Sequence, residues 1–485
     1  MAVTSVKYEF KEHGIISHPE TEVPWDAELF QQNFCISIIS MTDTMEFDMI
    51  NVNCCFPNAI RRALLAEVPS VCIERVYLHQ NTSIMPDEVL CHRLGLIPLN
   101  VDPKLLSFPA KALPLSDELP GFNPKEHLLF DLHAQFSKND ARLPNSRSGK
   151  DLSTEPAIPT VRSRAIYSSS IKWCPLPGQE ETFVPTPPSV VSDSILINKL
   201  SVGDEIEARC LAVKGVGRDH AKFSPVCAAY YKFMPVIDLL QPIEGELAKK
   251  LQASFAPGVI GIHPDTHEAF VLNPRLDNGS REHLRHPEFR DGSVIFVGVD
   301  ASHCIFTVES ITPDYRPPAR LVREAIDIMI NKCLHYLAVT EAPGFGYCSA
   351  NETKPKKSLD SQSTNVNTNS DVGTTRSQLN GREVSLEVTH MSPDKKRTTY
   401  TFYGEDHTLG LVLRYCVLHS TNATFCGYCV PHPLEDKIHF DIQVSAGTAT
   451  DALRAGLQCM HACFSHMKNA FKSAVTAFKR TEHKL

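Results

Sequence analysis

The sequence predicts an α+β fold in two parts of unequal size, and three observations predict it. Short helices lead into strand-like segments in both parts, a long helix closes each part, and residues 349–380 separate the parts. The separating segment is almost devoid of large apolar side chains, so it cannot bury enough surface to offset the entropy of ordering it. We therefore expect a flexible linker over residues 346–382, followed by a C-terminal part over residues 383–485.

The short helices are predicted from their end signals and their apolar spacing. Pro57 suits the first turn of a helix over residues 55–65, and Val68-Pro69 ends that helix. Asp406 is a good N-cap for a second short helix over residues 406–415. Both parts therefore share a plan, because strand-like segments follow each helix, at Ser70–Leu78, Thr424–Val430 and Lys437–Val444.

The closing helices are predicted to carry matched apolar seams. They cover roughly residues 318–337 and 448–479, and their apolar residues alternate steps of four and three. This spacing is typical of a helix that packs lengthwise on another helix. Burial in its own domain core explains either seam alone, but two matched seams favour an interface between the parts. The expected interface residues are Ile60, Leu64, Val322, Ile326, Met329, Cys333, Leu409, Leu413, Leu453, Leu457, Met460, Phe464, Met467 and Phe471.

A second change of composition lies inside the first part. Residues 106–195 are rich in Pro, Ser and charged side chains and have few periodic apolar runs. The chain on either side is richer in Val, Ile and Leu. We expect a smaller domain inserted at this place, which divides the larger domain into residues 30–105 and 196–345.

The composition and the charge exclude several functional classes. The chain has 485 residues, 42% of them hydrophobic and 21% charged, and its formal net charge is −8. A field of this sign does not favour nucleic acid, so no direct DNA contact is expected. The N-terminus lacks a signal-peptide pattern, and no apolar run approaches the roughly 18 residues of a membrane span. We expect the cytosol or the nucleus, where the 16 cysteines are mostly reduced.

One short stretch has the spacing of thiol or metal chemistry, Cys426-Gly427-Tyr428-Cys429. A redox dithiol of the thioredoxin type needs its first cysteine at a helix N-terminus, and the two prolines of Val430–Pro433 exclude a helix interior there. A tetrahedral zinc site needs four ligands, which only His432, Cys459 and Cys463 could complete. Ordinary strand and turn residues are favoured, and metal binding and thiol chemistry stay as alternatives.

Two further stretches gather charged residues. Lys214–Pro225 holds a G-x-G pattern, but the third glycine of a dinucleotide fingerprint is absent and the final proline blocks a following helix. A charged loop between two strands is favoured, and such loops often dock a partner. Asp87, Glu88 and His92 could form an acid/base pair on one helix face, but no other feature marks a pocket, so catalysis is disfavoured.

Several of these stretches together resemble one family. Residues 30–345 are similar to the large α-like subunit shared by RNA polymerases I and III, through Pro57–Arg62, Asn81–Ser83, Asp87–Pro98, Ser170–Trp173, Val213–Pro225 and Asn273–Asp277. The C-terminal part is similar to the natural partner of that subunit, the small α-like subunit, through Glu405–Gly410, Phe425–Tyr428, Pro431–Pro433 and Asp451–Leu453.

The resemblance implies an RNA polymerase α-like dimerisation domain with an inserted domain, linked to a second, minimal α-like dimerisation domain. Related subunits carry metal-binding cysteines in the insert, but Cys174 is the only cysteine of residues 106–195, so no zinc and no cofactor are expected. Two positions depart from the family pattern. Leu411 stands where Asn is favoured, and Cys429 stands where cysteine is unusual, so local packing is expected to differ.

The function implied by the resemblance is a non-catalytic assembly scaffold of DNA-directed RNA polymerases I and III, in the nucleolus and nucleoplasm. The expected partners are the largest and second-largest subunits and the small zinc-containing subunits. An α-like assembly of a polymerase II-like enzyme is the alternative. Because both α-like halves lie in one chain, we expect them to pair within it. The residues expected to dock partners are Arg61, Arg62, His92, Arg93, Lys214, Arg218, Asp219, His220 and Lys222.

Overall fold

The computed structural model describes residues 7–11, 14–18, 27–110, 113, 121–137, 163–290, 292–342, 345, 377–379 and 381–482. It divides into two compact units. The first contains Met1–Ala63, Ala228–Glu309 and Pro318–Leu485, and the second contains Leu64–Cys227 and Ser310–Pro317. Residues 346–376 and 380 of the expected linker lie outside the described residues. The linker was predicted to reach residue 382, but a strand already begins at Ser377.

The first sheet of the first unit is built from the chain before the linker. Its strand order is β2-β1-β16-β4-β3, and β13 also pairs with β16. Register places Phe47 opposite Phe306, and their rings stack with centroids 5.2 Å apart. The strands are β1 (Lys7–Lys11), β2 (Gly14–His18), β3 (Cys35–Met41), β4 (Thr44–Ile50), β13 (Val226–Leu239) and β16 (Ile295–Ser310).

A small lobe of the first unit lies between β13 and β16 in the sequence. Leu251 and Ala248 of its longest helix are fully buried, and they pack with Phe255 and Phe289 in one apolar cluster. The lobe consists of α5 (Gly245–Ala253), β14 (Ile260–Ile262), β15 (Ala269–Val271) and α6 (Pro287–Arg290).

The chain after the linker forms a second sheet with two helices. The strand order is β17-β18-β19-β21-β20. The first helix begins where the sequence predicts, because the Asp406 carboxylate accepts a hydrogen bond from the Thr408 N–H at 2.8 Å. This cap is confirmed. The two strands predicted at Thr424–Val430 and Lys437–Val444 are confirmed as well, as β20 and β21. The elements are β17 (Ser377–Leu379), β18 (Arg382–Met391), β19 (Arg397–Tyr403), α8 (His407–Ser420), β20 (Ala423–Cys429), β21 (Lys437–Val444) and α9 (Ala449–Glu482).

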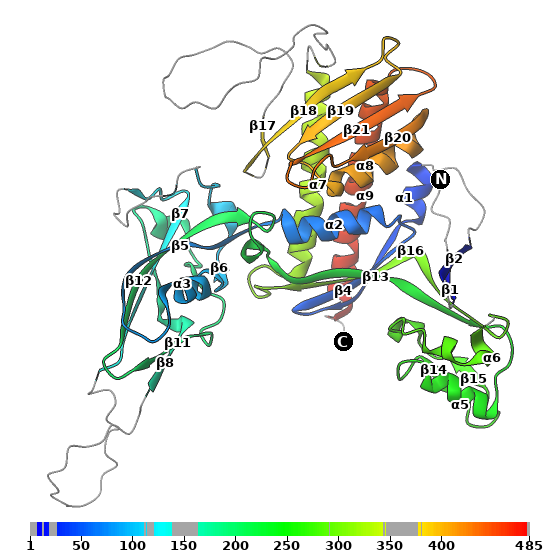
Figure 1. Ribbon diagram of the computed structural model, residues 1–485, viewed down its shortest axis with the longest axis horizontal. Helices are drawn as coiled ribbons and strands as arrows, with labels where there is room; N and C mark the ends of the chain where they lie inside the picture. The colour runs from blue at the N-terminus through cyan, green and yellow to red at the C-terminus, as the bar shows by residue number, and fades with distance from the viewer. Residues whose placement is uncertain are drawn as a thin grey trace, which may run out of the picture. The chain divides into compact units, whose positions relative to one another are not determined.

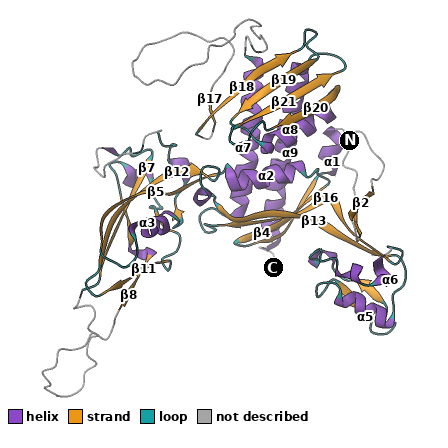
Figure 2. Ribbon diagram, viewed as in Figure 1, coloured by secondary structure: helices purple, strands orange, loops and turns teal. Residues whose placement is uncertain are grey.

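Helices α2, α7, α8 and α9 lie between the two sheets of the first unit (Figure 2). The long helices α7 and α9 run side by side, and α9 also contacts α8 and α1 (Figure 1). Strands of both sheets touch α9, β3 from the first sheet and β21 from the second. Among the described helices, none combines the length and the apolar character that crossing a membrane requires. The helices before the linker are α1 (Ala27–Asn33), α2 (Cys55–Ala66) and α7 (Pro318–Glu341).

The second unit is built on a sheet with the order β5-β12-β7-β9. It extends well beyond the expected insert of residues 106–195, because β12 pairs with β5 from Ile206 opposite Asn81 to Val216 opposite Pro69. Composition gives no sign of such long-range pairing. Its elements are β5 (Pro69–Asn81), α3 (Asp87–Gly95), β6 (Leu99–Asn100), β7 (His127–Gln135), β8 (Ser163–Tyr167), β9 (Ile171–Cys174), α4 (Gln179–Thr182), β10 (Ser189–Val190), β11 (Leu196–Ser201) and β12 (Glu205–Val216).

Candidate interface between the two halves

The first half, before the linker, and the second half, after it, meet along α7 and α9. The seam of α7 is closed to solvent, since Val322 and Ile326 are 1% exposed and Met329 and Cys333 are fully buried. On α9 every seam residue is at most 3% exposed, namely Leu453, Leu457, Met460, Phe464, Met467 and Phe471. Leu409 and Leu413 of α8 and Ile60 and Leu64 of α2 are buried as well. Their assignment to a pairing interface stays a prediction.

Aromatic rings of the first half contact aromatic rings of α9. The ring centroids of Phe56 and Phe464 lie 5.5 Å apart in an edge-to-face arrangement. Phe47 and Phe471 are placed in the same way at 5.6 Å. Such pairs stabilise by about 0.5–1.5 kcal/mol beyond their buried area. The large side chains of α9 therefore pack on helix α2 and strand β4 of the first half.

A buried polar cluster also joins the halves. The Lys332 ammonium on α7 lies 2.7 Å from the Glu405 carboxylate, just before α8, and the Tyr336 hydroxyl donates to the same carboxylate at 3.1 Å. The side chains of Lys332 and Glu405 are only 6% and 1% exposed. Removal of one member of such a pair leaves an uncompensated buried charge. The sequence prediction missed this cluster, although a lysine beside the apolar seam of α7 was a signal.

Two further ion pairs cross between the halves nearer the surface. Arg62 of α2 donates to the Asp406 carboxylate at 3.0 Å and to the Thr408 hydroxyl at 2.9 Å. Lys468 of α9 lies 2.7 Å from Asp327 of α7. Arg62 was predicted to dock a separate partner, whereas the structure uses its guanidinium within the chain, against the N-terminus of α8.

The contacts around α8 explain two of the stretches that carry the family resemblance. Gly410 faces the ring of Tyr428, where an added Cβ would lie 2.8 Å from a ring carbon. The Tyr428 hydroxyl lies 3.1 Å from Nδ1 of His407. The helix and the strand can therefore approach this closely only with glycine at position 410. The cap of α8 comes from Asp406, so the start of the helix does not depend on Leu411.

The Cys426–Cys429 stretch lies on strand β20 and does not form a dithiol site. Cys426 is 3% exposed and Cys429 is exposed to solvent, as expected for residues on opposite faces of a strand. Burial raises the pKa of Cys426 to about 12, so its thiol stays protonated. In the part of the chain that the structure describes, no group of three or more His, Cys, Asp or Glu side chains is placed to hold a metal ion.

Two lysines predicted to dock partners are engaged within the second unit. The Lys214 ammonium donates to the carbonyl of Leu106 at 3.0 Å and lies 4.7 Å from the ring centroid of Phe108. Burial lowers the pKa of the Lys214 ammonium. The Lys222 ammonium donates to the carbonyl of Ile73 at 2.9 Å. Neither contact could be foreseen, since each depends on pairing between distant segments.

The rest of this loop joins β12 to β13, as the sequence predicts. Gly217 allows this loop to pack closely on the backbone of Leu65, because an added Cβ would lie 2.0 Å from the Leu65 carbonyl oxygen. This explains the G-x-G pattern without a phosphate. Asp219 and His220 are exposed and Arg218 is half-buried.

The other residues expected to dock partners occupy two helices. The Arg61 guanidinium on α2 donates to the Asn58 side chain at 2.9 Å. On α3, Arg93 donates through Nε to the carbonyl of Ile197 at 3.1 Å, while His92 is exposed. These contacts leave the docking role of all nine residues a prediction.

The fold and the interface together define a dimerisation module, in which two sheet-and-helix halves bury matched helices against each other. Residues 46–333 and residues 397–470 each match a family model described as the RNA polymerase Rpb3/Rpb11 dimerisation domain. The chain belongs to this family.

Similar proteins include subunits of several polymerases. DNA-directed RNA polymerases I and III subunit RPAC1 of Mus musculus is 39% identical over 321 residues, which cover 66% of this chain and 88% of that protein. Its counterpart in Saccharomyces cerevisiae is 38% identical over 315 residues, which cover 64% of this chain and 89% of that protein. DNA-directed RNA polymerases II, IV and V subunit 3 of Arabidopsis thaliana is 30% identical over 300 residues, which cover 60% of this chain and 86% of that protein.

Proposed function

We propose that this protein is a structural subunit of DNA-directed RNA polymerases I and III, in which one chain carries a complete α-like heterodimer. The observation that carries the proposal is the occurrence of two dimerisation-domain matches on either side of the linker, with α9 of the second packed on the first. Five relatives named as subunits of polymerases I and III are 34–39% identical over 307–321 residues, against 28–33% over 202–300 residues for three named after polymerases II, IV or V. This difference favours the first two enzymes.

The covalent connection gives the proposed heterodimer a physical advantage. The sequence predicts a flexible linker of roughly 35 residues, and a flexible chain of that length has an r.m.s. span of about 30–35 Å. Tethering at this distance raises the effective concentration of one half near the other to about millimolar. The two halves then pair in equal numbers and before any other subunit is met. The chain would supply no active site, and it would act by holding other subunits in place.

The proposed partners are the largest and second-largest subunits of polymerases I and III and their small zinc-containing subunits. His92, Asp219 and His220 lie on the surface of the second unit, where a docked subunit could contact them. The acidic net charge of −8 suits a position away from the DNA. Such a subunit would support synthesis of rRNA, 5S rRNA and tRNA in the nucleus, with a share in the nucleolus.

The proposal is tested by purification of the protein from its own cells through a C-terminal tag, followed by mass spectrometry of the partners. We expect an intact chain of 53.9 kDa plus the mass of the tag, together with the largest subunits of polymerases I and III. Recovery of the polymerase II largest subunit instead would transfer the proposal to that enzyme. Recovery of no polymerase subunit would refute it, and a short tagged fragment would refute the single-chain heterodimer.

A second experiment tests the pairing itself. A site for a specific protease is inserted between residues 355 and 375, and the purified chain is cut. We expect the two halves to co-elute as one species after cleavage. The same chain with Leu457→Asp and Phe464→Asp should separate into its halves, because each change buries an unpaired charge. Halves that separate without these changes, or that stay together with them, would contradict the assigned interface.

A further inference from the structure

A group of thiols lies where two helices of the second half cross. Cys416 belongs to α8, and Cys459 and Cys463 lie one turn apart on α9. The thiols of Cys416 and Cys463 both donate hydrogen bonds to the sulfur of Cys459. Cys416 is fully buried and Cys463 is 5% exposed, whereas Cys459 is half-buried. A small solute therefore meets this group at Cys459.

A glycine brings the two helices close enough for these thiols to meet. At Gly456 of α9 an added Cβ would lie 3.3 Å from the backbone N and Cα of Val417 on α8. That distance is tighter than ordinary van der Waals contact, so only glycine lets the two backbones approach this closely. Cys416 directly precedes Val417, and Cys459 follows Gly456 by about one helical turn. The crossing therefore brings Cys416 and Cys459 together.

The geometry of a disulfide selects one partner for Cys459. A disulfide needs Cβ atoms about 3.5–4.5 Å apart. Residues four apart on a helix, such as Cys459 and Cys463, have Cβ atoms about 5–6 Å apart. A bond between them would distort α9, whereas Cys416 approaches from the crossing helix without that restriction.

The hydrogen bonds also decide which thiol reacts. Donation from the Cys416 thiol, and then from Cys463, lowers the pKa of Cys459 despite its burial. Burial raises the pKa of Cys416, and the hydrogen bond to Cys459 raises the pKa of Cys463. The thiolate is the form of cysteine that is oxidised, so oxidation of this group begins at Cys459.

We propose that Cys459 and Cys416 are an oxidation site for hydrogen peroxide, at which they close into a disulfide between α8 and α9. The Cys459 sulfur attacks one peroxide oxygen and the O–O bond breaks. This step leaves a sulfenic acid and a hydroxide, which takes up a proton as water. The Cys416 sulfur then attacks the Cys459 sulfur, the S–O bond breaks, and the Cys416 proton leaves with the hydroxide as water. Peroxide is reduced, two thiols are oxidised, and a thiol such as glutathione reopens the bond by exchange.

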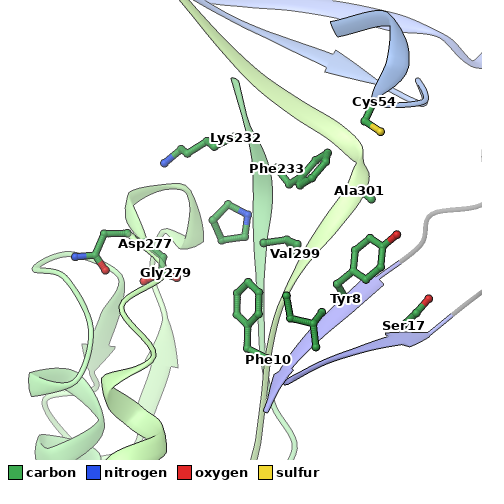
Figure 3. A pocket seen from close by; sticks show the side chains of 13 residues that line it. Tyr8, Phe10, Ser17, Cys54, Lys232, Phe233, Asp277, Gly279, Val299 and Ala301 are labelled. Carbon is green, nitrogen blue, oxygen red and sulfur yellow. The ribbon is translucent and has the colours of Figure 1, made fainter. Parts of the chain in front are cut away.

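A second half-buried cysteine of the first unit supplies a matched comparison. Figure 3 shows the Cys54 side chain on the same side of an apolar cavity of ≈ 750 Å³ as Ala301. The Cys54 thiol donates to the side-chain oxygen of Asn53 at 3.8 Å, and burial raises its pKa. Cys54 and Cys459 are therefore similar in exposure and opposite in the direction of their pKa shifts. Peroxide should distinguish them.

The test treats the intact, reduced chain with hydrogen peroxide, denatures it in iodoacetamide and maps its disulfides by mass spectrometry without reduction. We expect a cross-linked peptide that joins Cys416 to Cys459 and that dithiothreitol separates, while Cys54 is recovered alkylated. The peroxide dose is set by oxidation of the exposed Cys429. Alkylated Cys459 at that dose, a disulfide from Cys459 to any other cysteine, or equal oxidation of Cys54 would overturn the proposal.

Two variants separate the roles of the neighbouring thiols. Cys416→Ala should lose the cross-link, and the sulfenic acid at Cys459 should then persist and react with dimedone. Cys463→Ala should keep the cross-link, because Cys463 is not the disulfide partner. Loss of the cross-link in Cys463→Ala, or equal dimedone labelling of Cys459 with and without Cys416, would overturn the proposal. Should Cys416→Ala fail to fold, the disulfide map of the unaltered chain still decides.

Discussion

Replacement of Lys332 by Met should destabilise the junction of the two halves more than any surface change. The side chain of Lys332 is 6% exposed and that of its partner Glu405 is 1% exposed, at an N···O distance of 2.7 Å. Loss of the ammonium removes a positive charge 2.7 Å from a buried carboxylate, to which the Tyr336 hydroxyl still donates. Breaking a buried pair in this way costs about 3–5 kcal/mol. Lys468→Met is the matched control, because its pair with Asp327 is 41% and 38% exposed and should contribute less than about 1 kcal/mol.

The assay is amide hydrogen exchange followed by mass spectrometry, which measures the free energy of local opening in α7 and α9. We expect Lys332→Met to lower that free energy by about 3–5 kcal/mol in both helices. Glu405→Gln alone should have a comparable effect, since it removes the negative charge that faces the buried ammonium. The double variant should lose less than the sum, because it removes both charges and so leaves neither one uncompensated in the buried site. Additive losses, or a loss no greater than that of Lys468→Met, would refute this reasoning.

Three other changes test separate parts of the structure. Leu457→Asp should lower the opening free energy of α9 by about 4 kcal/mol or more, since its side chain is fully buried. Gly217→Ala should lower the melting temperature of the second unit, because the new Cβ would lie 2.0 Å from the carbonyl oxygen of Leu65. Iodoacetamide at pH 8 should modify the exposed Cys429 and spare Cys426, whose pKa burial raises to about 12; the Cys426 thiolate fraction rises only as pH approaches that value.

Each of these experiments has an internal comparison. Gly95→Ala, in the same unit, is the control for the glycine change, because the nearest heavy atom to a Cβ at that position is the Ile73 carbonyl oxygen at 3.6 Å, an ordinary contact. Denatured protein is the control for alkylation, since both cysteines should then react at similar rates. Equal labelling of the two cysteines in the folded chain, or an unchanged melting temperature in Gly217→Ala, would contradict the packing described.

The elements that the sequence predicted well are those with local signals. Asp406 marks the start of α8 through its own side chain, and the steps of four and three place the seams of α7 and α9 on one face each. The break in apolar content near residue 349 likewise separates the two family matches. Such signals are short-range, so a single sequence is enough to read them.

The features that the sequence did not predict depend on which distant segments meet. The insert was placed at residues 106–195 from composition, yet the pairing of β12 with β5 extends the compact unit to Leu64–Cys227. From the sequence, Arg62 and Lys214 are charged side chains that we expect to dock partners. Tertiary contacts with Asp406 and with the Leu106 carbonyl use them internally.

The sequence by itself determined two related α+β halves and their closing helices, because capping and apolar period are local properties of the chain. Only the tertiary structure decided that Glu405 is buried against Lys332 and that Phe464 of α9 packs on Phe56 of α2. Burial and partnership of a charged group are set by segments far apart in the chain, and no local pattern encodes them.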